Sequence, residues 1–207
     1  MKKFLTGFIF LLLAVFVLYN SIYFEKLGLK KQQEMKKNFN PKEAVDFFWK
    51  NKLDEILKTA INLNTFDSLL AVNPEYLIKQ YGKTVGISSD YSFLVKGDAK
   101  TVSPGAEEIP VVLSKGDYKY KLVLKYIFGN SARDAVGYFK VDDFKNTMDF
   151  NEVATELNSV ILKKVIDDKF VSLTPGEKVK FIGAIVINSE NIQKDLEVVP
   201  LKIEIIK

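Results

Sequence analysis

An apolar run from Phe4 to Phe24 divides this chain into two parts before any other feature is considered. A helix rises about 1.5 Å per residue, so a run of this length can cross a bilayer core of about 30 Å. The run exceeds a usual signal-peptide core, and no small-residue cleavage site follows it. We therefore expect a transmembrane signal anchor over residues 1–24, a charged spacer over 25–39 and a single domain over 40–207.

The charges around this run give the anchor an ambiguous orientation. Lys2 and Lys3 precede it, whereas five lysines follow it between residues 26 and 37. The positive-inside rule, applied literally, places the following domain in the cytoplasm. The orientation therefore has to be decided by other observations.

Composition excludes several kinds of chemistry. The sequence contains neither Cys nor His, which rules out a thiolate nucleophile, a Ser-His-Asp triad and a His or Cys zinc site. We expect no cofactor and no metal. The net charge of +4 arises from 30 basic and 26 acidic residues interleaved along the chain, which is typical of a solvated surface and does not predict nucleic-acid binding.

The first third of the domain has helical signals. Asn40, Pro41 and Glu43 form a helix start, and Thr65 and the segment Asn73–Pro74 indicate two further starts. Apolar residues then recur at three- and four-residue spacing, which indicates a helix face that we expect to pack on a sheet. That face comprises Val45, Trp49, Leu53, Ile56, Leu57, Ala60 and Ile61.

The period changes to two from Tyr91 onward, which predicts strands. The clearest is Tyr118–Phe128, where aromatic and aliphatic residues alternate with lysines. The other predicted strands are 91–97, 99–103, 109–114, 177–188 and 196–206, with Pro200 marking an edge or a bulge. We predict an α+β domain in which a small antiparallel β-barrel, possibly OB-like, is packed by helices.

The segment Gly129–Asn158 connects the clearest strand to a helix that we expect to be capped by Asn151 and to end near Asp167. It contains Arg133, the only arginine in the sequence. A planar guanidinium with five donors suits a carboxylate or several carbonyls at once. Arg133 could therefore recognise a ligand, or it could hold its own loop together with Asp134 as its partner.

Four segments in this order resemble the domain-of-unknown-function family 2291, described as predicted periplasmic lipoproteins. They are FFWKNKL at 47–53, GNSARDAVGYFKVDDFKN at 129–146, FNEVATELN at 150–158 and GEKVKFIGA at 176–184. The resemblance covers roughly residues 40–206. The family-like positions are Trp49, Gly129, Arg133, Asp134, Phe144, Asn146, Asn158 and Gly183.

The resemblance implies an exported location and an accessory or binding role beside sugar-uptake ABC transporters. This sequence lacks the cysteine that a lipoprotein needs, so the anchor is expected to be the helix itself, with the domain extracytoplasmic. A transporter component or a small polar ligand would be the partner. The candidate ligand or partner residues are Arg133, Asp134, Asn130, Asn146 and Asn158.

Three alternatives remain open. The domain could be purely structural at the cell envelope. It could be a hydrolase that uses paired carboxylates, although these acids have no distinctive spacing and we expect no enzyme. An OB-type nucleic-acid binder would need exposed aromatics beside lysines, whereas here they alternate onto opposite strand faces. The acids considered for hydrolysis are Asp134, Asp142, Asp143, Asp149 and Glu152.

Overall fold

The structure, a computed structural model, describes residues 39–102, 108–112, 118–166, 170 and 173–206, together with residues 12 and 15–17. The chain divides into two compact units, Met1–Phe39 and Asn40–Lys207. The predicted anchor and spacer belong to the first unit and lie almost entirely outside the described residues; residues 12 and 15–17 are helical. Among the residues that are described, no helix combines the length and hydropathy required to cross a membrane.

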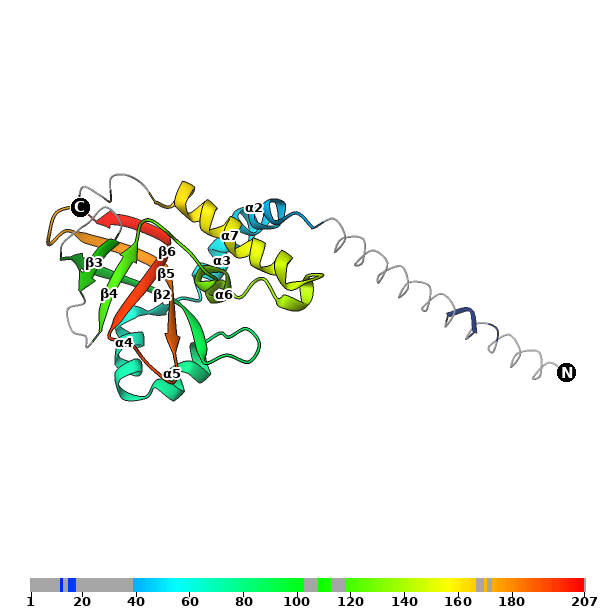
Figure 1. Cartoon of the computed structure of the whole chain (residues 1–207), viewed down its shortest axis with the longest axis horizontal. Coiled ribbons are helices and arrows are strands. Elements are labelled where there is room, and N and C mark those ends of the chain that lie inside the picture. Colours follow the sequence, from blue (N-terminus) through cyan, green and yellow to red (C-terminus); the bar gives the residue numbers. More distant parts are fainter. Residues whose placement is uncertain are drawn as a thin grey trace, which may run out of the picture. The chain divides into compact units, whose positions relative to one another are not determined.

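The second unit is built around a closed β-barrel (Figure 1). Neighbouring strands follow the order β1-β2-β3-β4-β6-β5, and a further pairing of β2 with β5 closes the ring. Closure removes the free sheet edges that would otherwise be open to other chains. The strands are β1 (Ile61–Asn62), β2 (Asp90–Thr101), β3 (Glu108–Val112), β4 (Lys119–Val123), β5 (Lys178–Asn188) and β6 (Asp195–Ile206).

The barrel agrees with the predicted α+β class, but it is not wholly antiparallel. β4 runs parallel to β6, and the short β1 runs parallel to β2. A parallel neighbour needs a crossover connection, and between β4 and β5 the chain leaves the barrel to form the helices beside it. The alternation of residues predicts strands, but it carries no information on their relative direction.

Two strand predictions need correction. The two short strands expected over 91–97 and 99–103 are one continuous strand, β2, because Gly97 and Asp98 pair with Phe181 and Lys180 of β5. The clearest predicted strand ends early, at Val123 rather than near Phe128. Beyond it, Tyr126 has a left-handed backbone with a φ of 57°, which is incompatible with a strand.

The core of the barrel contains a buried hydrogen-bonded pair. Tyr120 on β4 is 1% exposed, and its hydroxyl donates to the Oδ1 atom of Asp67 at 2.8 Å. Burial and the hydrogen bond to Asp67 both raise the pKa of Tyr120, burial having the larger effect. A buried carboxylate is stable only with partners, so this bond ties the helix that carries Asp67 to the barrel wall.

A bulge at Gly183 allows β5 and β6 to approach closely. The register shifts between Ile182 and Gly183, and Gly183 pairs with Pro200. This confirms the bulge predicted from Pro200, where a missing N–H is tolerated. A Cβ atom on Gly183 would lie 2.6 Å from the Cγ1 atom of Val198 and 2.7 Å from the carbonyl oxygen of Val199, so only glycine fits.

The N-terminal helices begin largely at the predicted residues. α2 (Pro41–Asn51) is capped by Asn40, and α5 (Pro74–Tyr81) by Asn73. α4 (Leu63–Val72) is capped by Asn62, so the prediction of Thr65 as its cap is wrong. A break at Lys52 separates α2 from α3 (Leu53–Leu57).

Helix α2 packs on α7 (Thr147–Lys164), not on a sheet (Figure 1). Phe48 is its fully buried aromatic residue, whereas Trp49 is only partly buried and has the Nζ atom of Lys164 5.6 Å from its ring centroid. The predicted stripe of residues 45–61 therefore spans two helices and faces more than one partner. Periodicity alone did not distinguish the adjacent positions 48 and 49.

The segment Gly129–Asn158 does form the connection from barrel to helix. It contains the short α6 (Ser131–Val136), a 3₁₀ turn η1 (Val141–Asp143) and the start of α7. α7 is capped by Asn146, whose side-chain oxygen accepts from the backbone N–H of Asp149 at 2.8 Å. The prediction of Asn151 as this cap was therefore wrong. Asn146 has the extended backbone of a cap residue, and its side chain reaches the N–H of the third residue of the helix.

Candidate functional site

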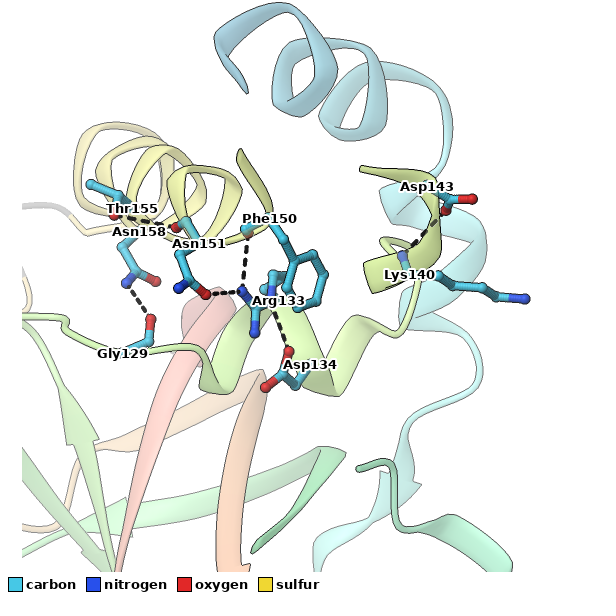
Figure 2. Close-up of polar contacts among 9 residues, drawn as sticks. All are labelled: Gly129, Arg133, Asp134, Lys140, Asp143, Phe150, Asn151, Thr155 and Asn158. Carbon is cyan, nitrogen blue, oxygen red and sulfur yellow. Dashed lines mark hydrogen bonds and ion pairs between the residues drawn. The ribbon is translucent and has the colours of Figure 1, made fainter. Parts of the chain in front are cut away.

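Arg133 lies on α6 and is almost completely buried, with 2% of its surface exposed. Its Nε atom donates to Asp134 Oδ1 at 2.8 Å. Its Nη1 atom donates to the backbone carbonyl of Phe150 at 3.0 Å and to the Oδ1 atom of Asn151 at 3.2 Å (Figure 2). These contacts connect α6 to the first turns of α7, so one guanidinium fixes the relative position of two helices.

The guanidinium also stacks on an aromatic ring. The Cζ atom of Arg133 lies 3.6 Å from the centroid of the Phe150 ring, which in turn contacts Phe144 at 5.3 Å between centroids. A planar, weakly hydrated cation is well suited to this stacked and buried position. The Nη2 atom makes no hydrogen bond to a described residue, so two of its donor hydrogens remain available.

Asn158 and Asn146 hold the same segment from other positions. The Nδ2 atom of Asn158, which is 7% exposed, donates to the carbonyl oxygen of Gly129 at 3.0 Å (Figure 2). Asn146 caps α7. Neither residue lines the two cavities described below. The structure therefore gives both a clear local task, namely fixing where the connecting loop leaves β4 and where α7 begins.

The other three predicted site residues come together in one cavity of about 390 Å³, here called the Arg133 cleft. Asn130, Arg133 and Asp134 line it on one side, and residues that precede and form β2 line it on the other. The hydroxyl of Ser92, a residue 5% exposed, makes no hydrogen bond to another described residue and faces the same cleft. The cleft is thus polar and contains unused donors and acceptors.

Lys83 is a cleft residue that the sequence did not single out. Its Nζ atom donates to the carbonyl oxygens of Ala135 at 2.6 Å and Val136 at 3.2 Å, at the end of α6. Desolvation by burial lowers the pKa of Lys83. Because a cation near a helix C-terminus satisfies otherwise free carbonyls, Lys83 also holds α6 in place. Lys83 and the carbonyl that it binds are 52 positions apart in the sequence, so no local pattern indicates this contact.

A second, larger cavity of about 730 Å³ lies next to the cleft and shares Asp90, Asn130, Ser131 and Val186 with it. We call it the aromatic groove, because Tyr126 and Phe128 line it with 56% and 77% of their surfaces exposed. The two rings are nearly parallel, at 11° with 6.3 Å between centroids. The left-handed backbone of Tyr126 costs about 1–3 kcal/mol in a residue with a side chain.

The acids proposed for hydrolysis do not form one site. Asp134 is bound to Arg133, Asp143 accepts from the backbone N–H of Lys140 at 3.3 Å, and Asp149 lies in the first turn of α7. Asp142 is exposed on η1, and Glu152 is exposed on α7. Among the described residues, no three acidic side chains are grouped so that they could hold a metal ion.

The strand order identifies the class of protein. Five strands form a ring in the order β2-β3-β4-β6-β5. In this ring β4 runs parallel to β6, and helices connect β4 to β5 along the chain. This arrangement is the Greek-key barrel of the OB-fold. A crystal structure of an OB-fold protein from Thermotoga maritima is similar, with a TM-score of 0.71 and 26% sequence identity. The match covers 82% of this chain and 99% of that one.

Within that class, the chain belongs to family DUF2291, described as predicted periplasmic lipoproteins, whose model matches residues 12–204. The resemblance seen in the sequence is thereby confirmed. A comparison with curated proteins finds no match. Neither the family description nor the similar structure names a ligand, a reaction or a transport partner.

Proposed function

We propose that this protein is a membrane-anchored, extracytoplasmic binding or accessory module without catalytic activity, and that the Arg133 cleft is its ligand site. One observation carries the proposal. Arg133 is 2% exposed, yet its Nη2 atom has no described protein acceptor, and the residue lines the cleft. Solvent reaches the Nη2 atom, because no fully buried side-chain nitrogen or oxygen of the described residues lacks a hydrogen-bond partner. A ligand that enters the cleft can therefore accept from Nη2 in place of water.

The chemistry of the cleft favours a small ligand rich in oxygen atoms. Arg133 and Asn130 offer donors suited to carboxylate and hydroxyl oxygens, and Ser92 can donate or accept. Asp134 neutralises part of the charge of Arg133, so the cleft does not demand a strongly charged anion. A sugar or a sugar acid meets these requirements, which agrees with a role beside a sugar transporter.

The proposed location rests on the family and on the first unit of the chain. The family is described as periplasmic, and residues 4–24 are apolar enough to serve as an anchor. Because the sequence contains no cysteine, it offers no thioether attachment for a lipid. We therefore favour anchoring by the polypeptide itself. Protease protection of the domain in intact spheroplasts would contradict this topology.

The ligand proposal is tested with the full chain in detergent micelles. Galacturonate, galactose and acetate are compared in thermal unfolding, because a ligand that binds only the folded state raises the midpoint. We expect galacturonate to raise it and acetate, which lacks the hydroxyls, to have little effect. A panel of neutral and acidic monosaccharides that leaves the midpoint unchanged would overturn the proposal.

Variants distinguish the cleft from other surfaces. Ser92→Ala and Asn130→Ala each change a residue that lines the cleft. Both variants keep the hydrogen bonds of Arg133 to α7. Ser68→Ala, on the exposed side of α4, is the matched control. The midpoint shift should shrink in both cleft variants and persist in the control. An undiminished shift in the cleft variants would place the ligand elsewhere.

A further inference from the structure

The aromatic groove has a composition different from that of the Arg133 cleft. Among the described residues that line it are four carboxylates and neither Lys nor Arg. Asp90 accepts from Asn188 and Glu190 from Ser89. The carboxylates of Asp195 and Glu197 on β6 line the groove and form no hydrogen bond or ion pair with a described side chain, although Lys119 and Lys121 of β4 lie opposite them in the strand register. A concave surface lined by one sign of charge concentrates ions of the opposite sign.

The exposed rings are held in place by a buried neighbour. Ile127, between Tyr126 and Phe128, is 5% exposed and therefore fixes the loop to the barrel. All three residues line the groove, Ile127 with its side chain buried and Tyr126 and Phe128 with theirs exposed. The rings are consequently presented by an anchored segment, and their exposure is a stable property of this surface. Large aromatic surfaces on a soluble domain commonly mark interaction sites.

The ring of Tyr126 already attracts a cation from its own chain. The Nζ atom of Lys125 lies 4.8 Å from the centroid of the Tyr126 ring, within the distance at which an ammonium interacts with a π face. Phe128 has no such cation among the described residues and is the most exposed aromatic side chain of the groove, at 77%. Its face, beside unpaired carboxylates, is the site that a mobile cation would occupy.

We propose that the aromatic groove is a second binding site, specific for small organic cations with a methylated or alkylated ammonium group. The ring faces of Phe128 and Tyr126 would contact the alkyl groups and the positive charge, while Glu197 and Asp195 supply the opposing negative charge. A phosphate-bearing ligand, including nucleic acid, is disfavoured because the same carboxylates would repel it.

Choline and its uncharged isostere 3,3-dimethyl-1-butanol are the probes, titrated by calorimetry into the full chain in detergent at constant ionic strength. The two molecules have the same shape and differ in charge. We expect saturable binding of choline and none of the isostere at the same concentration. Equal binding of the two would overturn the proposal, since it would indicate a merely apolar groove. The absence of choline binding up to tens of millimolar would overturn it as well.

Three variants locate the binding. Phe128→Leu keeps an apolar side chain but removes the π face, and should weaken choline binding by about threefold or more. Glu197→Gln removes one carboxylate of the groove and should weaken it as well. Glu204→Gln is the matched control, because Glu204 lies on the same strand, is similarly exposed and is outside the groove. If Glu197→Gln and Glu204→Gln weakened choline binding equally, the attraction would be a diffuse effect of surface charge, which would contradict a defined site.

Discussion

Arg133 illustrates how a side chain can be required by the geometry of its surroundings. It contacts a carboxylate one residue away, a carbonyl 17 residues away, a side-chain amide 18 residues away and the face of an aromatic ring. A lysine carries the same charge, but a single ammonium cannot direct donors along two edges of a plane while stacking on a ring.

Arg133→Lys is therefore expected to destabilise the domain. The replacement would lose the paired bonds to Phe150 and Asn151 and the stacking on the Phe150 ring, and a hydrogen bond from a charged group typically contributes about 1.5–3 kcal/mol. Thermal unfolding of the full chain in detergent measures the effect, and Lys140→Arg, at an exposed position, controls for the exchange of residue type. An unchanged midpoint would mean that Arg133 does not brace α6 against α7.

The presence of this arginine is visible in the sequence, but its contacts are not. Its only carboxylate partner, Asp134, is adjacent and was foreseen, whereas Phe150 and Asn151 are reached through the packing of α6 on α7. Tyr126 and Phe128 were missed for a related reason. The alternation of residues 118–128 predicts a strand that continues to Phe128. In the structure the strand ends at Val123, and the left-handed backbone of Tyr126 turns the chain away from the barrel.

At the scale of elements, β5 and β6 approach each other closely at the bulge. Gly183 is opposite Pro200 at the bulge, where a Cβ atom on position 183 is not accommodated and the missing N–H of Pro200 is tolerated. The glycine and the proline are visible in the sequence, and their pairing confirms the predicted bulge. The pairing partner and the depth of the contact depend on the barrel, which no local pattern describes.

Gly183→Ala should destabilise the domain strongly. Its Cβ atom would come within 2.7 Å of the backbone oxygen of Val199, so the two strands would have to separate. Overpacking of this kind costs about 1–3 kcal/mol. Gly176→Ala is an instructive comparison, because a Cβ there meets no atom but requires a φ of 90°. Chemical denaturation of both variants separates the cost of a steric clash from that of backbone strain.

For helices, local capping signals located some starts correctly and misplaced others. Asn40 and Asn73 cap the helices that they were expected to cap. Thr65 and Asn151 satisfied the same sequence criteria but lie inside helices whose caps are Asn62 and Asn146. Several polar residues near one helix start are chemically equivalent in the sequence, and the tertiary contacts of the helix decide among them.

For the whole molecule, the barrel core contains an ionisable pair that links stability to pH. The pKa of Tyr120 is raised, so the folded state retains its proton where the unfolded state, with an ordinary tyrosine pKa of about 10, releases it. The stability associated with this group is complete below that value and decreases as the pH rises above it.

We therefore expect the free energy of unfolding to fall between about pH 10 and 11, by up to about 1.4 kcal/mol per pH unit from this residue. Tyr120→Phe removes the titrating group, so its stability should have a shallower dependence on alkaline pH, although its stability at neutral pH is lower because Asp67 loses a donor. Denaturant titrations of both proteins at several pH values give the comparison. Identical alkaline slopes would contradict the assignment.

The α+β class and the barrel could be predicted from the helix-start signals and the period of the apolar residues, and the family from its segments. The closure of the ring and the parallel neighbours could not, because both depend on pairings between distant segments, such as β4 with β6. The same holds for the two cavities, because both linings combine β2, β5 and the connection after β4, and the aromatic groove adds the β5–β6 turn.

Closure of the barrel also has a kinetic consequence. The β2–β5 seam joins residues as far apart as Asp90 and Asn188, which are separated by 98 positions, and the last strand, β6, lies between β4 and β5. Non-local pairings of this kind make folding slow. A nascent or translocating chain cannot complete its core until its final strand is delivered, so its apolar strands need protection for the whole of that interval.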